Sequence, residues 1–341
     1  MNDKFEKKNL DIKQTKNLLA GYQKPKTLRS LWQLANTLIP YFFLWYLMVL
    51  SLNVSYFITL ALSVIAAGFM VRSFIIFHDC GHGSFFESRR ANDAVGIITG
   101  LFTLTPYYRW RHDHAIHHAT AGDLDRRGVG DVRTITVQEY LAMSSSKRFF
   151  YRFYRHPIVL FIIGPFLVFT VGHRFFAPGS SKRERWSVHY TNLALAGIIT
   201  GLIFIIGWKA FLLIQVPILF IGTSVGVWLF YIQHNFDGTY WERHEKWNFY
   251  QAGLNGSSFY KLPAILQWFS GNIGFHHIHH MNSRIPNYLL PKCHRENPIF
   301  QVKPVTILSS LKCLRLRFWD EENHCMVGLE ALNKIRYNPT T

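Results

Sequence analysis

The stretch Ser30–Val71 reads SLWQLANTLIPYFFLWYLMVLSLNVSYFITLALSVIAAGFMV and lies between Arg29 and Arg72 without one charged residue. A helix rises about 1.5 Å per residue. These 42 residues would therefore form a helix about twice as long as the hydrocarbon core of a bilayer is thick. The stretch predicts two membrane-spanning helices, at 31–52 and 54–77, and Pro40 should bend the first of them.

A second long apolar region, Tyr190–Phe236, contains a single charged residue, Lys209. It is also long enough for two spans. We place them at 190–208 and 210–232, joined by a tight turn around Gly207 and Lys209. The sequence therefore predicts an all-α, polytopic membrane protein with four transmembrane helices.

Two shorter apolar stretches, Ala94–Tyr108 and Pro157–Val171, are near or below the length that spans a bilayer. We expect both to be interfacial or re-entrant. A fifth span at Pro157–Val171 is the alternative. With a fifth span, an odd number of crossings would separate the histidine clusters described below and place them on opposite sides of the membrane. If the clusters meet, an even number of crossings must separate them.

The charges are distributed unevenly along the chain. Lys and Arg number 37 against 20 Asp and Glu, a net charge of +17. The basic residues of 1–30, 147–155 and 174–185 all fall on one side of the predicted spans. Under the positive-inside rule this side is cytoplasmic. We therefore expect a cytoplasmic tail over 1–30, a single domain over 31–341, and a cytoplasmic-membrane protein with both termini and the site inside the cell.

Other classes are disfavoured by the same features. The first 29 residues are too polar for a cleavable signal peptide. The four cysteines form no CxxC pair, which fits a reducing compartment and disfavours a disulfide framework or an iron–sulfur site. We expect the positively charged surface to bind a membrane or an acidic protein and not to bind nucleic acid.

Seventeen histidines are present, and eight of them form three clusters. One cluster is a pair spaced i, i+4, and two are triplets spaced i, i+3, i+4, so each set shares a face of a helix. Each triplet should present three imidazoles to one point. The clusters are His78 and His82; His114, His117 and His118; and His276, His279 and His280.

Two neighbouring histidines are left out of these clusters. At about 100° per residue, His112 lies on the face opposite His114, so we do not expect it to bind a metal. His277 lies about 100° from His276, and its role stays open.

Polar neighbours of the clusters have two possible roles. Asp79 and Asp113 directly flank candidate ligands and could each receive the second ring proton of a bound histidine. The alternative for each is a solvated interfacial carboxylate. Gly81 and Gly83 would let the backbone approach a metal closely.

Eight converging imidazoles exceed the ligand set of a single ion and imply two metals. The clusters lie at the ends of apolar helices, which suits an acyl chain better than a water-soluble substrate. Attack on an unactivated alkyl carbon needs a redox metal and oxygen, so iron is favoured over zinc.

These motifs resemble the membrane fatty acid desaturases, in particular the bacterial acyl-lipid type related to plant oleate desaturases. The likeness covers Phe77–Tyr288 and rests on His-Asp-Cys-Gly-His at 78–82, on the triplet at 114–118 followed by Gly-Asp-Leu-Asp-Arg-Arg-Gly at 122–128, and on 274–286. It implies four spans beneath a cytoplasmic helical cap and a di-iron centre with about nine histidines. The ninth position matches His234.

The resemblance also implies a function. The protein would introduce a double bond into the acyl chain of a membrane lipid, with O2 as co-substrate and two iron ions as cofactor. The eight cluster histidines would be catalytic, and with His234 they would be the metal ligands. The chain has no haem-binding His-Pro-Gly-Gly segment, so electrons would come from an external donor such as ferredoxin or flavodoxin. An acidic donor would suit the basic cytoplasmic surface.

Two alternatives remain open at this point. One is a fatty acid or carotenoid hydroxylase or ketolase on the same di-iron scaffold. The other is a membrane carrier of metal or haem. Four aromatic residues, Trp228, Phe230, Tyr231 and Trp268, would line an acyl channel or be ordinary membrane-facing and core residues.

Overall fold

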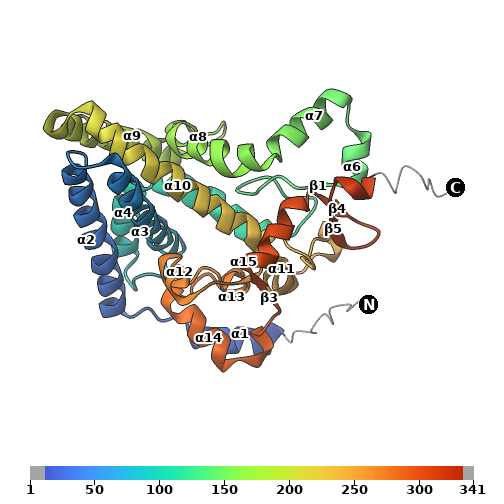
Figure 1. Cartoon of the computed structure of the whole chain (residues 1–341). Helices are drawn as coiled ribbons and strands as arrows, with labels where there is room; N and C mark the ends of the chain where they lie inside the picture. The colour runs from blue at the N-terminus through green and yellow to red at the C-terminus, as the bar shows by residue number, and fades with distance from the viewer. Residues whose placement is uncertain (1–11, 333–341) are drawn as a thin grey trace.

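The structure is a computed structural model that describes residues 12–332. Figure 1 shows the long helices gathered on one side of the molecule, with short helices and small strands covering one end of them. The described part of the chain is mainly helical, as predicted.

Four helices are long and apolar enough to cross a membrane, which confirms the predicted number. They are α2 (Thr27–Ser51), α3 (Tyr56–His82), α9 (Lys182–Ile206) and α10 (Trp208–His234).

The helices differ in their bounds from the predicted spans at 31–52, 54–77, 190–208 and 210–232. The helices continue beyond the apolar stretches because backbone hydrogen bonding does not stop where hydropathy changes. For example, α9 begins eight residues earlier, at a capping box in which Ser181 and Glu184 satisfy free amides. α3 and α10 run on to His82 and His234.

The turns fall close to where the sequence placed them. Residues 52–55 separate α2 from α3, and Gly207 alone separates α9 from α10. Gly207 has φ of +81°, a conformation that costs glycine little and other residues much more. The second hairpin therefore turns on one residue.

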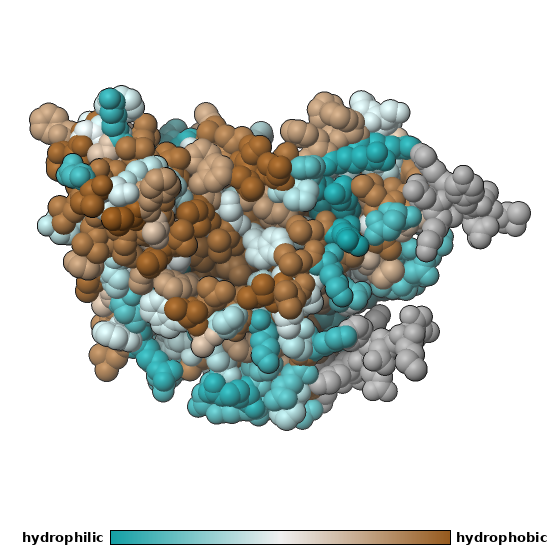
Figure 2. Space-filling model, viewed as in Figure 1, coloured by the Kyte–Doolittle hydropathy of each residue, from teal (hydrophilic) through white to brown (hydrophobic). Residues whose placement is uncertain are grey.

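The helix α3 lies at the centre of the bundle. It packs against α2 on one side and α10 on another, around buried apolar residues that include Met48, Met70 and Ile214. The outward faces remain apolar, as at Phe204, which is 93% exposed. Figure 2 shows brown, apolar side chains covering this part of the surface, as expected for helices whose solvent is lipid.

The two shorter apolar stretches form separate short helices. Ala94–Tyr108 is divided between α4 (Arg89–Phe102) and α5 (Tyr107–Thr120). Pro157–Val171 holds a π-helical turn, η1 (Val159–Ile163), and α8 (Gly164–Thr170). The helical segment Val159–Arg174 is bent by 58° from the helix before it, α7 (Ser145–Tyr154), and only as a broken pair do the two pass the length and composition test for a span.

The remaining described residues form the cap. Its helices are α1 (Ile12–Ala20), α6 (Val137–Ala142), α11 (Phe249–Gly256), α12 (Ala264–Phe269), α13 (His276–Met281), α14 (Leu290–Glu296), α15 (Ile307–Ser310) and the 3₁₀ turns η2 (Gly172–Arg174), η3 (His244–Lys246), η4 (Asn287–Leu289), η5 (Pro298–Phe300) and η6 (Leu311–Arg315).

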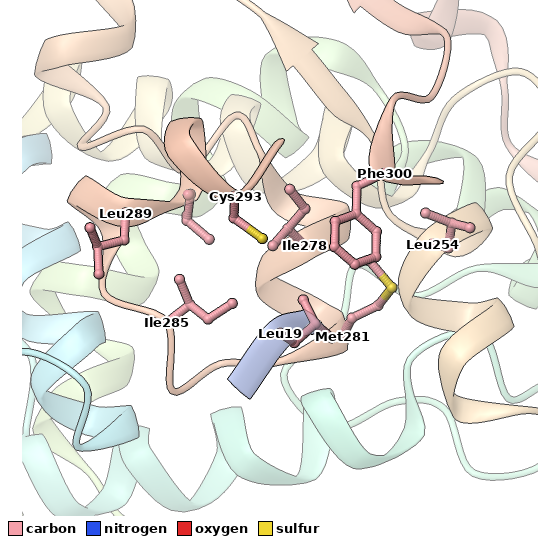
Figure 3. Packing of buried hydrophobic residues seen from close by; sticks show 9 residues of the cluster. Leu19, Leu254, Ile278, Met281, Ile285, Leu289, Cys293 and Phe300 are labelled. Carbon is pink, nitrogen blue, oxygen red and sulfur yellow. The ribbon is translucent and has the colours of Figure 1, made fainter. Parts of the chain in front are cut away.

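Two small sheets tie distant segments of the cap together. One has the order β1 (Ile135–Thr136), β4 (Phe318–Asp320), β5 (Cys325–Val327), and the other pairs β2 (Phe259–Lys261) with β3 (Pro304–Thr306) in parallel. Under them lies an apolar cluster around α13, α14 and α1, with Ile278 and Phe300 fully buried (Figure 3). This cluster holds α13 in place.

Candidate metal centre

The candidate ligands sit at one end of the bundle and on two helices beside it, α5 and α13. His78 and His82 occupy the last turn of α3, and His234 is the last residue of α10. The two triplets lie on α5 and α13. Since α3 and α10 run in the same direction across the bundle, their last turns meet at the same end. The even number of crossings predicted between the clusters agrees with this arrangement.

The nine histidines form two groups, in each of which one ring nitrogen from every residue lies within 4.8 Å of those of the others. The first group contains His78, His82, His114, His118 and His279, and the second contains His117, His234, His276 and His280.

Each triplet is divided between the two groups, so the expectation that a triplet serves one point is wrong. On a helix, residues i and i+4 differ by about 40°, whereas i+3 and i+4 differ by about 100°. His114 and His118 therefore face one group while His117 faces the other. On α13 the same split sends His276 and His280 to the second group and His279 to the first. Each helix thus supplies a pair to one group and a single histidine to the other.

The ring nitrogens are spaced as ligands of an ion would be. The Nε2 atom of His234 lies 3.2 Å from that of His117 and 3.0 Å from that of His276. In the first group, His118 Nε2 lies 3.1 Å from the Nε2 atoms of both His114 and His279. Two imidazoles at right angles on an ion, each with a bond of about 2.1 Å, would place their nitrogens about 3.0 Å apart, against about 3.4 Å at a tetrahedral angle.

Several ring nitrogens are buried without a protein partner among the described residues, including Nε2 of His82 and of His280. An orphaned buried nitrogen is costly unless something binds it. The five donors of the first group exceed the four ligands of a tetrahedral zinc site, and the four donors of the second group would fill such a site completely. The donor set therefore fits two transition-metal ions of high coordination number.

The electrostatics favour the neutral form of five of these histidines, two on α5 and three on α13. Burial, followed by the neighbouring imidazoles, lowers the pKa of His114 and His118 well below 6.5. The same causes lower the pKa of His276, His279 and His280. Neutral imidazoles keep a lone pair for a metal.

Two carboxylates orient the candidate ligands. Asp79 Oδ1 lies 3.3 Å from Nδ1 of His78, and its other oxygen accepts hydrogen bonds from the backbone and side chain of Asn287, at 2.7 and 2.9 Å. Asp131, in the loop after α5, makes a short contact with Nδ1 of His117. Each carboxylate can hold its histidine in the tautomer that points Nε2 at a metal.

Asp113 does not have the orienting role considered for it. It is half-buried and faces Arg109 at 4.0 Å, one helical turn back. The sequence does not predict the contact of Asp131 with His117, because a loop after a helix has no periodicity that relates it to the helix. Its only signal was its place just beyond the Gly122–Gly128 motif.

His112 and His277, the two histidines next to the clusters in the sequence, lie outside both groups. His112 is exposed, 3.9 Å from Glu184. His277 is buried, and its Nε2 lies 2.8 Å from the carbonyl oxygen of Phe300. Burial lowers the pKa of His277 to about 3, so its neutral ring donates this hydrogen bond and holds α13 on the cap.

Aromatic rings enclose the groups from the bundle side. The Trp110 ring stacks on His114 at 4.3 Å, and Phe230 lies 5.1 Å from His117 and 5.3 Å from His234, between ring centroids. A Cβ on Gly81 would come within 3.0 Å of Trp110. The small residue at 81 therefore makes room for this tryptophan, and Gly83, with φ of +70°, ends α3. Packing at Gly81 and the end of the helix at Gly83 account for these two glycines, whereas the sequence suggested a close approach of the backbone to a metal.

Of the other aromatic candidates, three have structural partners. Trp228 Nε1 bonds to Tyr260, and Tyr231 bonds to the carbonyls of Cys313 and Leu316. Trp268 packs against the guanidinium of Arg72.

The sequence is similar to those of known proteins. A family model described as fatty acid desaturase matches residues 53–302. A fatty acid desaturase of Bacillus subtilis is 49% identical over 324 residues, covering 95% of this chain and 92% of the relative. An sn-1 acyl-lipid omega-3 desaturase (ferredoxin) of Synechocystis is 30% identical over 64% of this chain and 61% of the relative, and a Delta(12) fatty acid dehydrogenase of Crepis alpina is 25% identical over 65% and 62%. The four membrane helices, the paired histidine groups and these matches establish that the chain belongs to the fatty acid desaturase family of oxidoreductases.

Proposed function

We propose that this protein is an acyl-lipid desaturase that holds two iron ions in its two histidine groups and takes electrons from a separate carrier protein. The observation that carries the proposal is the convergence of nine histidines into two groups at one end of four apolar helices. The names of the acyl-lipid relatives support the choice of substrate class.

Iron bound in both groups would supply the oxygen-dependent redox chemistry that removes two hydrogens from neighbouring saturated carbons. The first group would hold one ion with His78, His82, His114, His118 and His279, and the second would hold the other with His117, His234, His276 and His280.

The chain's own residues would hold the imidazoles in position and exclude water from the two groups. Asp79 and Asp131 fix two of the imidazoles, and Trp110 and Phe230 cover the groups on the bundle side. Because only the carbons held beside the metals can react, a misplacement of about 1 Å would cost roughly two orders of magnitude in rate.

The substrate side faces the bilayer. Figure 2 shows the apolar surface hollowed near the middle of the view, with brown side chains around the hollow, between α10 and α12 as Figure 1 places them. An acyl chain could enter here directly from the membrane without crossing water, which suits a substrate that remains part of a lipid.

Electrons would arrive on another face. An open hollow of about 450 Å³ reaches His118 and His280, one histidine from each group, and is bordered by Phe249 and Arg284. The rings of His118 and His280 stack at 4.1 Å between centroids. A soluble donor such as ferredoxin or flavodoxin would be able to approach both groups here. We place this face, and both termini, in the cytoplasm on the positive-inside rule.

Expression in a host that lacks unsaturated lipids tests the function. Lipid extracts should contain a new double bond, whose position is mapped by mass spectrometry of its adducts. The His117→Ala variant should insert into membranes but form none, while His112→Ala, which changes an exposed histidine on the same helix, should keep activity.

The same lipid extracts separate the two rival functions. New hydroxyl groups without unsaturation would assign the protein to the hydroxylases. Metal or haem uptake that depends on the protein, with lipids unchanged, would assign it to the carriers.

A further inference from the structure

The outward face of α7 is aromatic. Phe149, Phe150 and Phe153 are 64%, 67% and 57% exposed. Three exposed phenylalanines in ten helical residues form a patch that a water-facing surface rarely keeps. Something apolar is therefore expected to cover this face.

The positions around the helix define the patch. At about 100° per residue, Phe149, Phe153 and Phe150 span an arc of about 100°. Lys147 lies about 60° beyond one edge of this arc and Arg152 about 60° beyond the other. Both cationic side chains are exposed. An aromatic face bordered on both sides by cations is the pattern of a helix that lies in a membrane interface.

The inner face of α7 carries the groups that water would otherwise solvate. Tyr151 is buried against Tyr140 and Phe318, and Arg148 donates to the carbonyl of Leu141. Arg155, at the end of the helix, is fully enclosed. A helix surrounded by water would be turned the other way, with its phenylalanines inside.

Arg155 also sets the depth of α7. Its guanidinium donates to the carbonyls of Arg133 and Leu316 and to the hydroxyl of Tyr231. Tyr231 lies one turn before His234, at the cap end of the span α10. One end of α7 is therefore fixed where a span leaves the bilayer, and the 58° bend from the following helical segment turns α7 away from the direction of that segment.

We propose that α7 is an interfacial helix that inserts Phe149, Phe150 and Phe153 between the acyl chains of an anionic bilayer and binds lipid headgroup phosphates with Lys147 and Arg152. The four basic residues within 147–155 make this segment too polar to cross the hydrocarbon core. Their sign selects phosphate-bearing anionic lipid over neutral lipid.

Spin labelling of the full-length protein in lipid nanodiscs tests the proposal. Nitroxides are attached at Phe150→Cys and Phe153→Cys, and at Glu322→Cys as the control. Glu322 is exposed in the turn between β4 and β5. Collision rates are measured with oxygen, which concentrates in lipid, and with a water-soluble nickel chelate.

Labels on α7 should collide with oxygen at least several-fold more often than with the nickel chelate, whereas the label at 322 should show the reverse. Equal accessibility at 150 and 322 would overturn the proposal. So would protection of the α7 labels from both reagents, since it would mean that a protein, such as a second copy of this chain, covers the face.

The binding of anionic lipid headgroups by α7 is tested separately. In discs of anionic lipid, the label at 150 should be shielded more from the nickel chelate than in discs of zwitterionic lipid, and Lys147→Gln should reduce that difference. The same shielding in both lipids would overturn the binding of anionic headgroups. A sharp elution profile and an unchanged helical spectrum of each variant would show that it is folded.

Discussion

At the scale of the residue, two of the candidate ligands, His117 and His78, have an orienting carboxylate as well as a lone pair for a metal. Asp131 and Asp79 contact Nδ1 of His117 and His78, which leaves Nε2 for a metal. Burial alone would raise the pKa of Asp131, but the charge and hydrogen bond of His117 lower it. The carboxylate is therefore ionised at neutral pH and strengthens its histidine as a donor.

Replacing Asp131 with Asn should lower the affinity of the second group for iron by about 10- to 100-fold, because His117 loses the anion that orients it. Iron retained per protein after dialysis against a graded chelator measures this. Asp113→Asn, one turn before His117 on α5 and facing Arg109, serves as the control and should retain iron as the unmodified protein does. Equal retention by the two variants would show that Asp131 has no part in binding.

The metal-free protein should lose stability as the pH falls below about 6.5. The folded state keeps His114, His118, His276, His279 and His280 neutral, since their pKa values are lowered by burial, whereas the unfolded chain takes up protons from about pH 6.5 downwards. The thermal midpoint should therefore be flat above about pH 7.5 and decline towards pH 5. A midpoint independent of pH over this range would contradict the lowered pKa values, and His112→Ala should leave the profile unchanged.

At the scale of the element, the last turn of α10 is held by a segment far along the chain. Tyr231 accepts a hydrogen bond from Arg155 and lies 2.9 Å from the carbonyls of Cys313 and Leu316. Residues 304–327, which lie beyond the family match at 53–302, thus brace the helix that carries His234. The predicted helix count needed only hydropathy, but this brace depends on contacts between residues more than 80 positions apart.

Tyr231→Phe should therefore lower the free energy of unfolding by about 1–3 kcal/mol, because Arg155 and two carbonyls lose a buried partner. The thermal midpoint in detergent measures the loss. Tyr190→Phe, at an exposed tyrosine of α9, is the matched control and should change it little. Similar midpoints for the two variants would mean that the hydroxyl of Tyr231 is dispensable.

At the scale of the whole molecule, the ends of the four helices define two faces. The cap lies at one end, and the turn at Gly207, followed by Lys209, lies at the other. The strong excess of basic residues belongs to the cap side. Orientation in the membrane should follow from this asymmetry.

A cysteine at Lys209 should react with a membrane-impermeant maleimide added to intact cells, whereas one at Glu322 should react only after the cells are opened. Both positions are exposed, so accessibility from each side decides the result. The native cysteines Cys80, Cys293 and Cys313 are buried and should give little background, and Cys325, which is partly exposed, is replaced by Ser in both variants. The opposite labelling pattern would place the cap outside the cell.

The sequence by itself determined the four spans, the end of the bundle where the site lies, and the eight clustered histidines, because hydropathy and helical periodicity are local properties. The tertiary structure decided how each triplet divides between two groups, that Asp131 and not Asp113 contacts an imidazole, and that His277 faces a carbonyl. These depend on how α5 and α13 face each other and on where loops return. Such relations arise only when distant segments pack, and periodicity along one segment does not contain them.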